Sequence, residues 1–122
     1  NKSVSILGLS YKPDTPVIEE SPSVKLIEQL LINDVEIIVY DPLAIDNARA
    51  YFGDNILYAS SIRDCIRHSS ICIITTQISE FKRIDESYFT GTDHVLIDCW
   101  RVIEPETVCS KVRYVALGKA VD

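Results

Sequence analysis

The stretch VSILGLSYKPDTPVIEESP, residues 4–22, contains the pattern that decides the fold. It opens with an apolar run, Val4–Leu7, that ends at Gly8 and predicts a short buried strand. Later in the stretch, Ser21 and Pro22 predict the start of a helix, because serine is a favoured N-cap and proline is favoured at the first helical position. A buried strand followed by a helix is the repeating unit of an α/β fold.

The same alternation continues to the end of the chain. Strands are predicted at Ile37–Tyr40, Ile56–Tyr58, Ile71–Ile74, Val95–Ile97 and Tyr114–Leu117, and helices or helical turns at 24–31, 44–51, 61–67, 85–90 and 105–110. Runs that are apolar on both faces are typical of parallel strands, which helices cover on both sides. The sequence therefore predicts one α/β domain over residues 1–122, a doubly wound, mostly parallel, three-layer Rossmann-like sheet of about five to six strands.

The composition excludes several classes of function. A net charge of -6 argues against nucleic acid as a partner, since that partner needs a positive surface. The apolar runs are too short to span a membrane. The four cysteines, Cys65, Cys72, Cys99 and Cys109, include no C-x-x-C pair, so no metal or redox site is predicted. Reduced cysteines without a signal peptide indicate a cytoplasmic protein.

The loop after the first strand is the first candidate for ligand binding, because ligands of doubly wound sheets bind beyond the carboxyl ends of the strands. It is longer than the usual length of about two to six residues, which is common in functional loops. Gly8 is its only glycine, so the multi-glycine fingerprint of an NAD site is missing and no cofactor-binding residue is predicted. Lys12 stands where a phosphate-binding cation could lie, and the alternative is a solvated surface lysine.

Asp41 ends the second predicted strand, where Rossmann proteins place an acid that binds the ribose of the cofactor. No glycine fingerprint precedes it, however, and an Asp-Pro pair often begins a turn. We therefore interpret Asp41 and Pro42 as a turn and keep the ribose ligand as the alternative.

Five short motifs follow one another along the chain: GLSYK at 8–12, VYDP at 39–42, T-x-x-x-E-F at 76–81, L-I-D-x-x-R at 96–101 and LGK at 117–119. In this order they resemble the C-terminal domain of the UDP-glucose/GDP-mannose dehydrogenase family. The opening signature of that domain is roughly G-L-x-[FY]-K-x-x-T-x-D-x-R-x-S-P. It is matched here by Gly8, Leu9, Tyr11, Lys12, Thr15, Ser21 and Pro22.

The resemblance implies a nucleotide-sugar-binding module, the C-terminal fragment of an NAD-dependent enzyme that oxidises the C6 alcohol of a UDP-sugar to a carboxylate. In such enzymes NAD is bound mainly by a separate N-terminal domain, and the parent enzyme is expected to be a homo-oligomer. The catalytic cysteine of the family precedes this domain, so no catalytic residue is expected here and the isolated chain should be inactive. A chain that has no methionine and opens on Asn1 also favours an excised domain.

The resemblance also implies a substrate site made by Tyr11, Lys12 and Arg101. Lys12 would contact the diphosphate, with Tyr11 as its aromatic neighbour. Arg101 would reach the substrate, since a planar guanidinium suits phosphate or carboxylate. The alternative for Arg101 is a surface salt bridge with Glu104.

Five residues depart from the family pattern, and two of them, Gln77 and Ile78, replace the usual Glu-Trp pair. Val17 replaces the signature aspartate, Glu19 the signature arginine, and Trp100 an arginine that many members carry. A carboxylate at position 19 would repel a pyrophosphate. The alternative function is therefore a non-enzymatic interaction or regulatory module with a degenerate nucleotide site.

Overall fold

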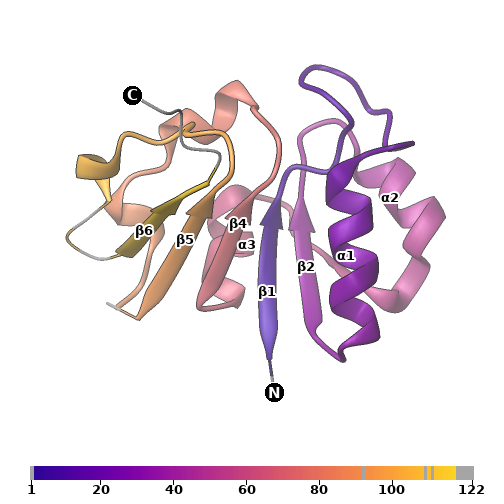
Figure 1. Cartoon of the computed structure of the whole chain (residues 1–122), viewed down its shortest axis with the longest axis horizontal. Helices are drawn as coiled ribbons and strands as arrows, with labels where there is room; N and C mark the ends of the chain where they lie inside the picture. The colour runs from indigo at the N-terminus through magenta and orange to yellow at the C-terminus, as the bar shows by residue number, and fades with distance from the viewer. Residues whose placement is uncertain (1, 92, 109, 111, 118–122) are drawn as a thin grey trace.

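The computed structural model describes residues 2–91, 93–108, 110 and 112–117. These residues form a six-stranded sheet of order β3-β2-β1-β4-β5-β6, with helices on its faces (Figure 1). The strands are β1 (Ser3–Leu7), β2 (Glu36–Tyr40), β3 (Leu57–Tyr58), β4 (Ile71–Ile74), β5 (His94–Asp98) and β6 (Val112–Ala116). The α-helices are α1 (Pro22–Ile32), α2 (Ile45–Phe52) and α3 (Ile62–His68), and short 3-10 turns lie at Gly53–Asn55, Ser79–Arg83, Glu86–Tyr88 and Pro105–Thr107.

Every neighbouring pair of strands is parallel, which confirms the predicted doubly wound α/β sheet. The strand order reverses between β1 and β4, so this is the switch point where such folds bind their ligands. In the register, Leu7 lies opposite both Tyr40 and Ile74. Asp98 lies opposite Ile74 on one side and Ala116 on the other. The carboxyl ends of five strands therefore form one row.

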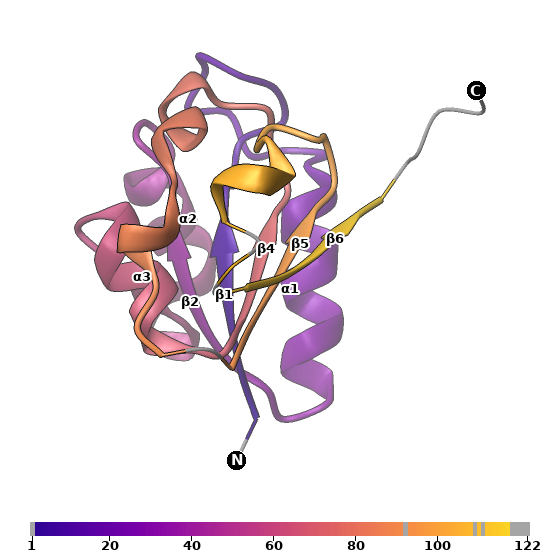
Figure 2. The same ribbon diagram turned by 90° about the vertical axis from the view of Figure 1, so that its left-hand side faces the viewer.

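The two faces of the sheet are covered by different elements (Figure 2). On one face, α1 and α2 pack on β1 and β2 through a core that includes Ile6, Ile27 and Phe52. On the other face, α3 and the 3-10 turns pack on β1, β4 and β5 through a second core, which includes Cys65 and Phe81. Three layers are thus formed around the centre of the sheet, as predicted.

The two serines predicted to begin helices form the N-caps of α1 and α3. The side chain of Ser21 accepts a hydrogen bond from the backbone N–H of Ser23 (3.1 Å), and Pro22 is the first residue of α1. Ser61 caps α3 in the same way, through the N–H of Asp64 (3.1 Å).

The differences from prediction lie in the short segments. The segment predicted as helical over 105–110 is a 3-10 turn, and the 3-10 turn at Ser79–Arg83 was not predicted. Turns this short lack the repeat that makes a longer helix visible in a sequence. The last strand begins at Val112, two residues before the predicted start at Tyr114.

Candidate functional site

Two loops leave the carboxyl edge of the sheet on either side of β4. One follows β1 and carries Tyr11 and Lys12; the other follows β5 and carries Arg101. Because Leu7, Ile74 and Asp98 end their strands in one row, both loops begin at the same level. This edge, at the top of Figure 1, is where the fold predicts a ligand.

Gly8 opens the first loop with a backbone conformation that favours glycine, φ +105°. A Cβ at this position would lie 2.6 Å from both the Cβ and the Oγ1 of Thr76, the second residue after β4. In a dinucleotide fingerprint the glycines let the backbone approach a pyrophosphate. Here Thr76 fills the space beside Gly8, so the glycine allows the two loops to pack closely against each other.

Asp41 fixes the first residues of this loop from the end of the neighbouring strand. Its carboxylate is 2% exposed, and Oδ2 accepts hydrogen bonds from the N–H groups of Leu9 (2.8 Å) and Ser10 (3.2 Å). Oδ1 accepts from Leu43 (2.9 Å) and Ala44 (3.0 Å) in the turn that leads to α2. Both oxygens therefore accept hydrogen bonds within the protein, and the predicted turn is observed at residues 42–44.

Hydroxyl groups join the starts of the first loop and of α1 to the end of β4. Thr75, the first residue after β4, donates from Oγ1 to the carbonyl oxygen of Gly8 (2.6 Å) and accepts from the Ser23 hydroxyl (2.7 Å). Ser21 donates from Oγ to the carbonyl oxygen of Leu9 (2.8 Å). The switch point is thus a hydrogen-bonded junction of three segments, which makes its geometry stiff.

Beyond this junction the loop is exposed. The N–H of Tyr11 donates to the carbonyl oxygen of Val17 (2.7 Å), which closes a small loop around Lys12. Tyr11 is 55% exposed, and Lys12 is also exposed. Within the described part of the chain, no hydrogen bond or ion pair engages the Lys12 ammonium. Its charge is therefore available to an anionic ligand.

Asp98 organises the second loop. It is fully buried at the end of β5, and its Oδ1 accepts hydrogen bonds from the N–H groups of Trp100 (3.2 Å) and Val102 (3.0 Å). Its Oδ2 accepts from the N–H of Ile103 (2.8 Å) and from the hydroxyl of Tyr114 on β6 (2.8 Å). Burial, and then the hydrogen bond to Asp98, raise the pKa of Tyr114 above its ordinary value. This carboxylate was not predicted as a site residue, although it ends a strand just as Asp41 does.

Arg101 lies between two residues whose N–H groups Asp98 holds, and its φ of +54° is uncommon for a side chain other than glycine. The side chain is exposed. Arg101 and Glu104 both belong to the described residues and make no salt bridge. The alternative in which Arg101 pairs with Glu104 on the surface is therefore not observed. The loop thus presents a guanidinium from a fixed backbone.

A family model described as "UDP-glucose/GDP-mannose dehydrogenase family, UDP binding domain" matches residues 5–105. The chain belongs to this family. It is 33% identical to UDP-glucose 6-dehydrogenase of Rickettsia conorii over 98% of this chain and 29% of that protein. It is also 33% identical to UDP-glucose 6-dehydrogenase AglM of Haloferax volcanii, over 84% of this chain and 24% of that protein. The chain therefore spans less than a third of these relatives.

Solved structures of the family share the fold. A UDP-glucose dehydrogenase from Pyrobaculum islandicum superposes with a TM-score of 0.79 at 26% identity, covering 97% of this chain and 25% of that one. The UDP-N-acetyl-mannosamine dehydrogenase Cap5O from Staphylococcus aureus gives a TM-score of 0.71 at 27% identity, over 95% of this chain and 26% of that one. The Rossmann-like architecture predicted from the sequence is therefore that of the family.

An open groove of about 500 Å³ lies between the end of the first loop, α1 and α2. Its lining includes the carboxylates of Glu19, Glu20 and Glu28 and the ammonium of Lys25. An excess of carboxylates does not suit a diphosphate. A second hollow of about 400 Å³ lies beyond β2 and β3. None of the three predicted substrate residues lines either hollow, so the structure places them on an open edge of the sheet.

Three cysteines, Cys65, Cys72 and Cys99, lie in the part of the chain that the structure describes. Cys65 and Cys72 are buried, and burial raises the pKa of Cys65 to about 12 and that of Cys72 above its ordinary value. Cys99 is half-buried, and its pKa is also raised, mainly by burial. A thiol with a raised pKa is a poor nucleophile at neutral pH. Cys109 and the predicted Gly118-Lys119 motif lie outside the described residues.

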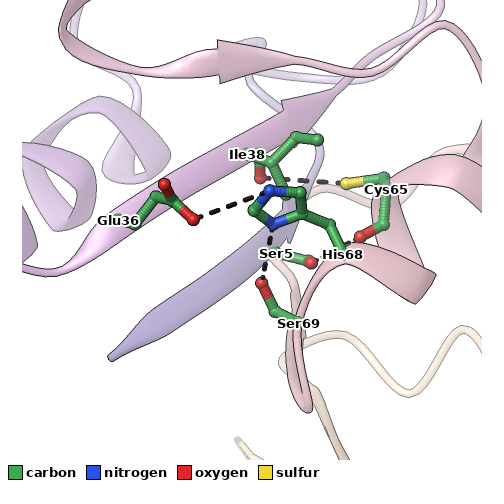
Figure 3. Close-up of polar contacts among 6 residues, drawn as sticks. All are labelled: Ser5, Glu36, Ile38, Cys65, His68 and Ser69. Atoms are coloured by element: carbon green, nitrogen blue, oxygen red, sulfur yellow. Dashed lines mark hydrogen bonds and ion pairs between the residues drawn. The ribbon is translucent and has the colours of Figure 1, made fainter. Parts of the chain in front are cut away.

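Figure 3 shows the surroundings of Cys65 on α3. Its sulfur lies 3.8 Å from the carbonyl oxygen of Ile38, and Ser5 donates a hydrogen bond to its backbone carbonyl. His68 at the end of α3 pairs with Glu36 on β2 (3.6 Å), at the edge of the sheet opposite to the two loops. These contacts join helix to sheet.

Among the described residues, no cluster of His, Cys, Asp or Glu could hold a metal ion. No helix in the same part of the chain is long and apolar enough to cross a membrane. At the carboxyl edge, the side chains of Tyr11, Lys12 and Arg101 are exposed and can reach a ligand.

Proposed function

We propose that this chain is the nucleotide-sugar-binding module of an NAD-dependent UDP-sugar 6-dehydrogenase, which oxidises the sugar C6 alcohol to a carboxylate. One observation carries the proposal: two exposed cations, Lys12 and Arg101, lie at the carboxyl edge of the sheet on either side of the switch point, and neither forms an ion pair with any residue that the structure describes. The match of residues 5–105 to the UDP binding domain of the family supports it. A cytoplasmic, homo-oligomeric parent enzyme is part of the same proposal.

The chemistry of the two side chains fits a diphosphate. The guanidinium of Arg101 can donate two parallel hydrogen bonds to phosphate oxygens, and the ammonium of Lys12 acts as a mobile point charge. With a net charge of -6, the rest of the chain does not attract an anion. Binding therefore depends on these local cations, and Tyr11 adds an exposed aromatic ring beside Lys12.

The first loop of this chain does not have the features of a binding site for the NAD of the proposed reaction. The only glycine of the first loop faces Thr76, and Glu19 stands in an acidic groove where the family signature has an arginine. We therefore assign NAD mainly to the N-terminal domain of the parent enzyme. The described cysteines have raised pKa values, which makes them poor nucleophiles, so we assign this module the role of binding and orienting the substrate.

The alternative is a non-enzymatic interaction or regulatory module. It is favoured by Val17 and Glu19, both exposed at positions where the family signature has an acid and a base. Such a module would keep the fold without binding the nucleotide. Binding of UDP therefore distinguishes the two functions.

Calorimetric titration of the chain with UDP tests the proposal. We expect Lys12→Ala and Arg101→Ala each to weaken UDP binding roughly tenfold, because each removes a charge-assisted contact with phosphate. Lys25→Ala is the matched control, since Lys25 lies in the acidic groove and its loss should leave the affinity unchanged. Absence of UDP binding by the folded chain, or binding that neither substitution weakens, would contradict the proposal.

A further inference from the structure

We infer that the indole ring of Trp100 is the surface on which the uracil base of the bound nucleotide stacks, between the two cations. This inference rests on the proposed function and adds a specificity-determining residue to it. Trp100 stands where many members of the family have an arginine, so the family pattern does not supply this role.

Trp100 is exposed but fixed. Its side chain is 54% exposed, although tryptophan is usually largely buried. Its indole N–H donates a hydrogen bond to the carbonyl oxygen of Thr75 (2.9 Å), and its backbone N–H donates to Asp98 (3.2 Å). The only polar atom of the ring is thus satisfied inside the protein, and the ring surface left to solvent is apolar.

The ring lies between the loops that carry the cations. Trp100 belongs to the loop after β5, but Thr75 is the first residue after β4, so the indole reaches back across the end of β4. The hydroxyl of Thr75 in turn bonds to the carbonyl oxygen of Gly8, where the loop of Lys12 begins. Trp100 therefore extends from the residue beside Arg101 to the switch point between β4 and β1.

This position suits the flat face of a base. Stacking on an aromatic side chain stabilises a bound base without requiring hydrogen bonds to its edge. A sugar ring would instead need hydrogen-bond partners for its hydroxyl groups. The hydroxyl and the carbonyl oxygen of Thr75 beside the indole already have such partners, so Thr75 is not offered to a sugar. With the base on the indole, the diphosphate of the same nucleotide is held by cations on either side.

The experiment uses the fact that Trp100 is the single tryptophan of the chain, so its fluorescence reports on this ring alone. The chain is titrated with UDP, pyrophosphate, uridine and UDP-glucose, with excitation at the red edge of indole absorption, where uracil does not absorb. We expect UDP, uridine at higher concentration, and UDP-glucose to quench the emission, and pyrophosphate to leave it unchanged.

Affinities measured by calorimetry complete the test. Trp100→Leu should weaken UDP binding roughly tenfold and leave pyrophosphate binding unchanged. Trp100→Phe, which keeps an aromatic ring, should retain most of the UDP affinity. That result would also show that the loop still folds when Trp100 is replaced. Tyr51→Leu is the matched control, because Tyr51 is equally exposed (57%) but lies in the acidic groove.

The outcomes separate this inference from the function on which it rests. UDP binding without quenching, and unaffected by Trp100→Leu, would overturn the stacking role and leave the proposed function intact; the exposed indole would then be a contact for another domain. Quenching by UDP-glucose but not by UDP would place the sugar on the indole and overturn the assignment of the base. No UDP binding by the folded chain would overturn both.

Discussion

The loop of Lys12 and the loop of Arg101 are built alike up to a point. Each is held by a buried strand-end aspartate that accepts four hydrogen bonds. Asp98 bonds to the N–H groups on both sides of Arg101. In the loop of Lys12, Asp41 bonds only to the N–H groups of Leu9 and Ser10, which precede Lys12; its other two bonds go to the turn before α2.

The difference is one of preorganisation. The backbone beside Arg101 is fixed before any ligand arrives, so less backbone entropy remains to be lost on binding. Lys12 lies in an exposed loop closed by the hydrogen bond from Tyr11 to Val17. Neither side chain has a hydrogen-bond or ion-pair partner among the described residues, so the two cations differ in their backbone support.

The largest effect is expected from Asp98→Ala. The substitution leaves the N–H groups of Trp100, Val102 and Ile103 without their acceptor and removes one of the two acceptors of the Tyr114 hydroxyl, which should lower the free energy of unfolding by about 3 kcal/mol or more. Urea unfolding followed by circular dichroism measures this, with the exposed Asp93→Ala as control. A loss smaller than about 1 kcal/mol would mean that the loop is held by other contacts.

Gly8→Ala should be the next most damaging change, and it acts on the other loop. A methyl group would overlap Thr76 at 2.6 Å, in a backbone conformation that side chains rarely adopt. We expect a loss of about 2 kcal/mol in stability and weaker UDP binding. At Gly91, φ is also positive (+75°) but an added Cβ meets nothing within 4 Å, so Gly91→Ala is the control. Equal losses at the two glycines would show that overlap with Thr76 is unimportant.

Exchanging the two cation types tests preorganisation directly. Arg101→Lys should weaken UDP binding about fivefold, which is less than Arg101→Ala because a charge remains, but a loss is expected because the planar fork is removed from a fixed backbone. Lys12→Arg should change the affinity by only about twofold, since an unrestrained side chain can accommodate the larger head group. Calorimetry with UDP measures both. A greater loss for Lys12→Arg than for Arg101→Lys would reverse the comparison.

The smallest predicted effect is a loss of stability at alkaline pH that arises from Tyr40 and Tyr114. Burial, followed by a hydrogen bond to Glu80, raises the pKa of Tyr40 to about 12, and burial with the bond to Asp98 raises that of Tyr114. The fold therefore favours the neutral phenols: their stabilisation is complete below the unfolded pKa of about 10 and is lost as pH rises through the folded values.

Urea midpoints measured at pH 8 and pH 11 check this expectation. Tyr40→Phe and Tyr114→Phe should each reduce the alkaline loss of stability, and Tyr114→Phe should also cost about 1 kcal/mol at neutral pH, because it removes a bond to Asp98. Tyr11→Phe, which removes an exposed hydroxyl, should leave the midpoints unchanged. If neither Tyr40→Phe nor Tyr114→Phe reduces the loss of stability at alkaline pH, these two hydroxyl groups are excluded as its source.

Much of the fold could be read from local patterns. Apolar runs such as Ile71–Ile74 predicted buried parallel strands, and Ser21 with Pro22 predicted the start of α1 within a residue. These signals depend only on neighbours in sequence, so they survive without knowledge of the fold. The positions of Lys12 and Arg101 after strands were also predictable, because residues that follow parallel strands gather at one edge.

What the tertiary structure alone decided is how these edge residues are held. The burial of Asp98, the contact of Gly8 with Thr76 and the reach of Trp100 to Thr75 all depend on β4 lying between β1 and β5. Strand order is set by packing across the whole sheet, and no local repeat in the sequence encodes it. The sequence therefore determined which cations follow the ends of the strands. The fold decided that Asp98 fixes the backbone beside Arg101 and that an indole lies between the two loops.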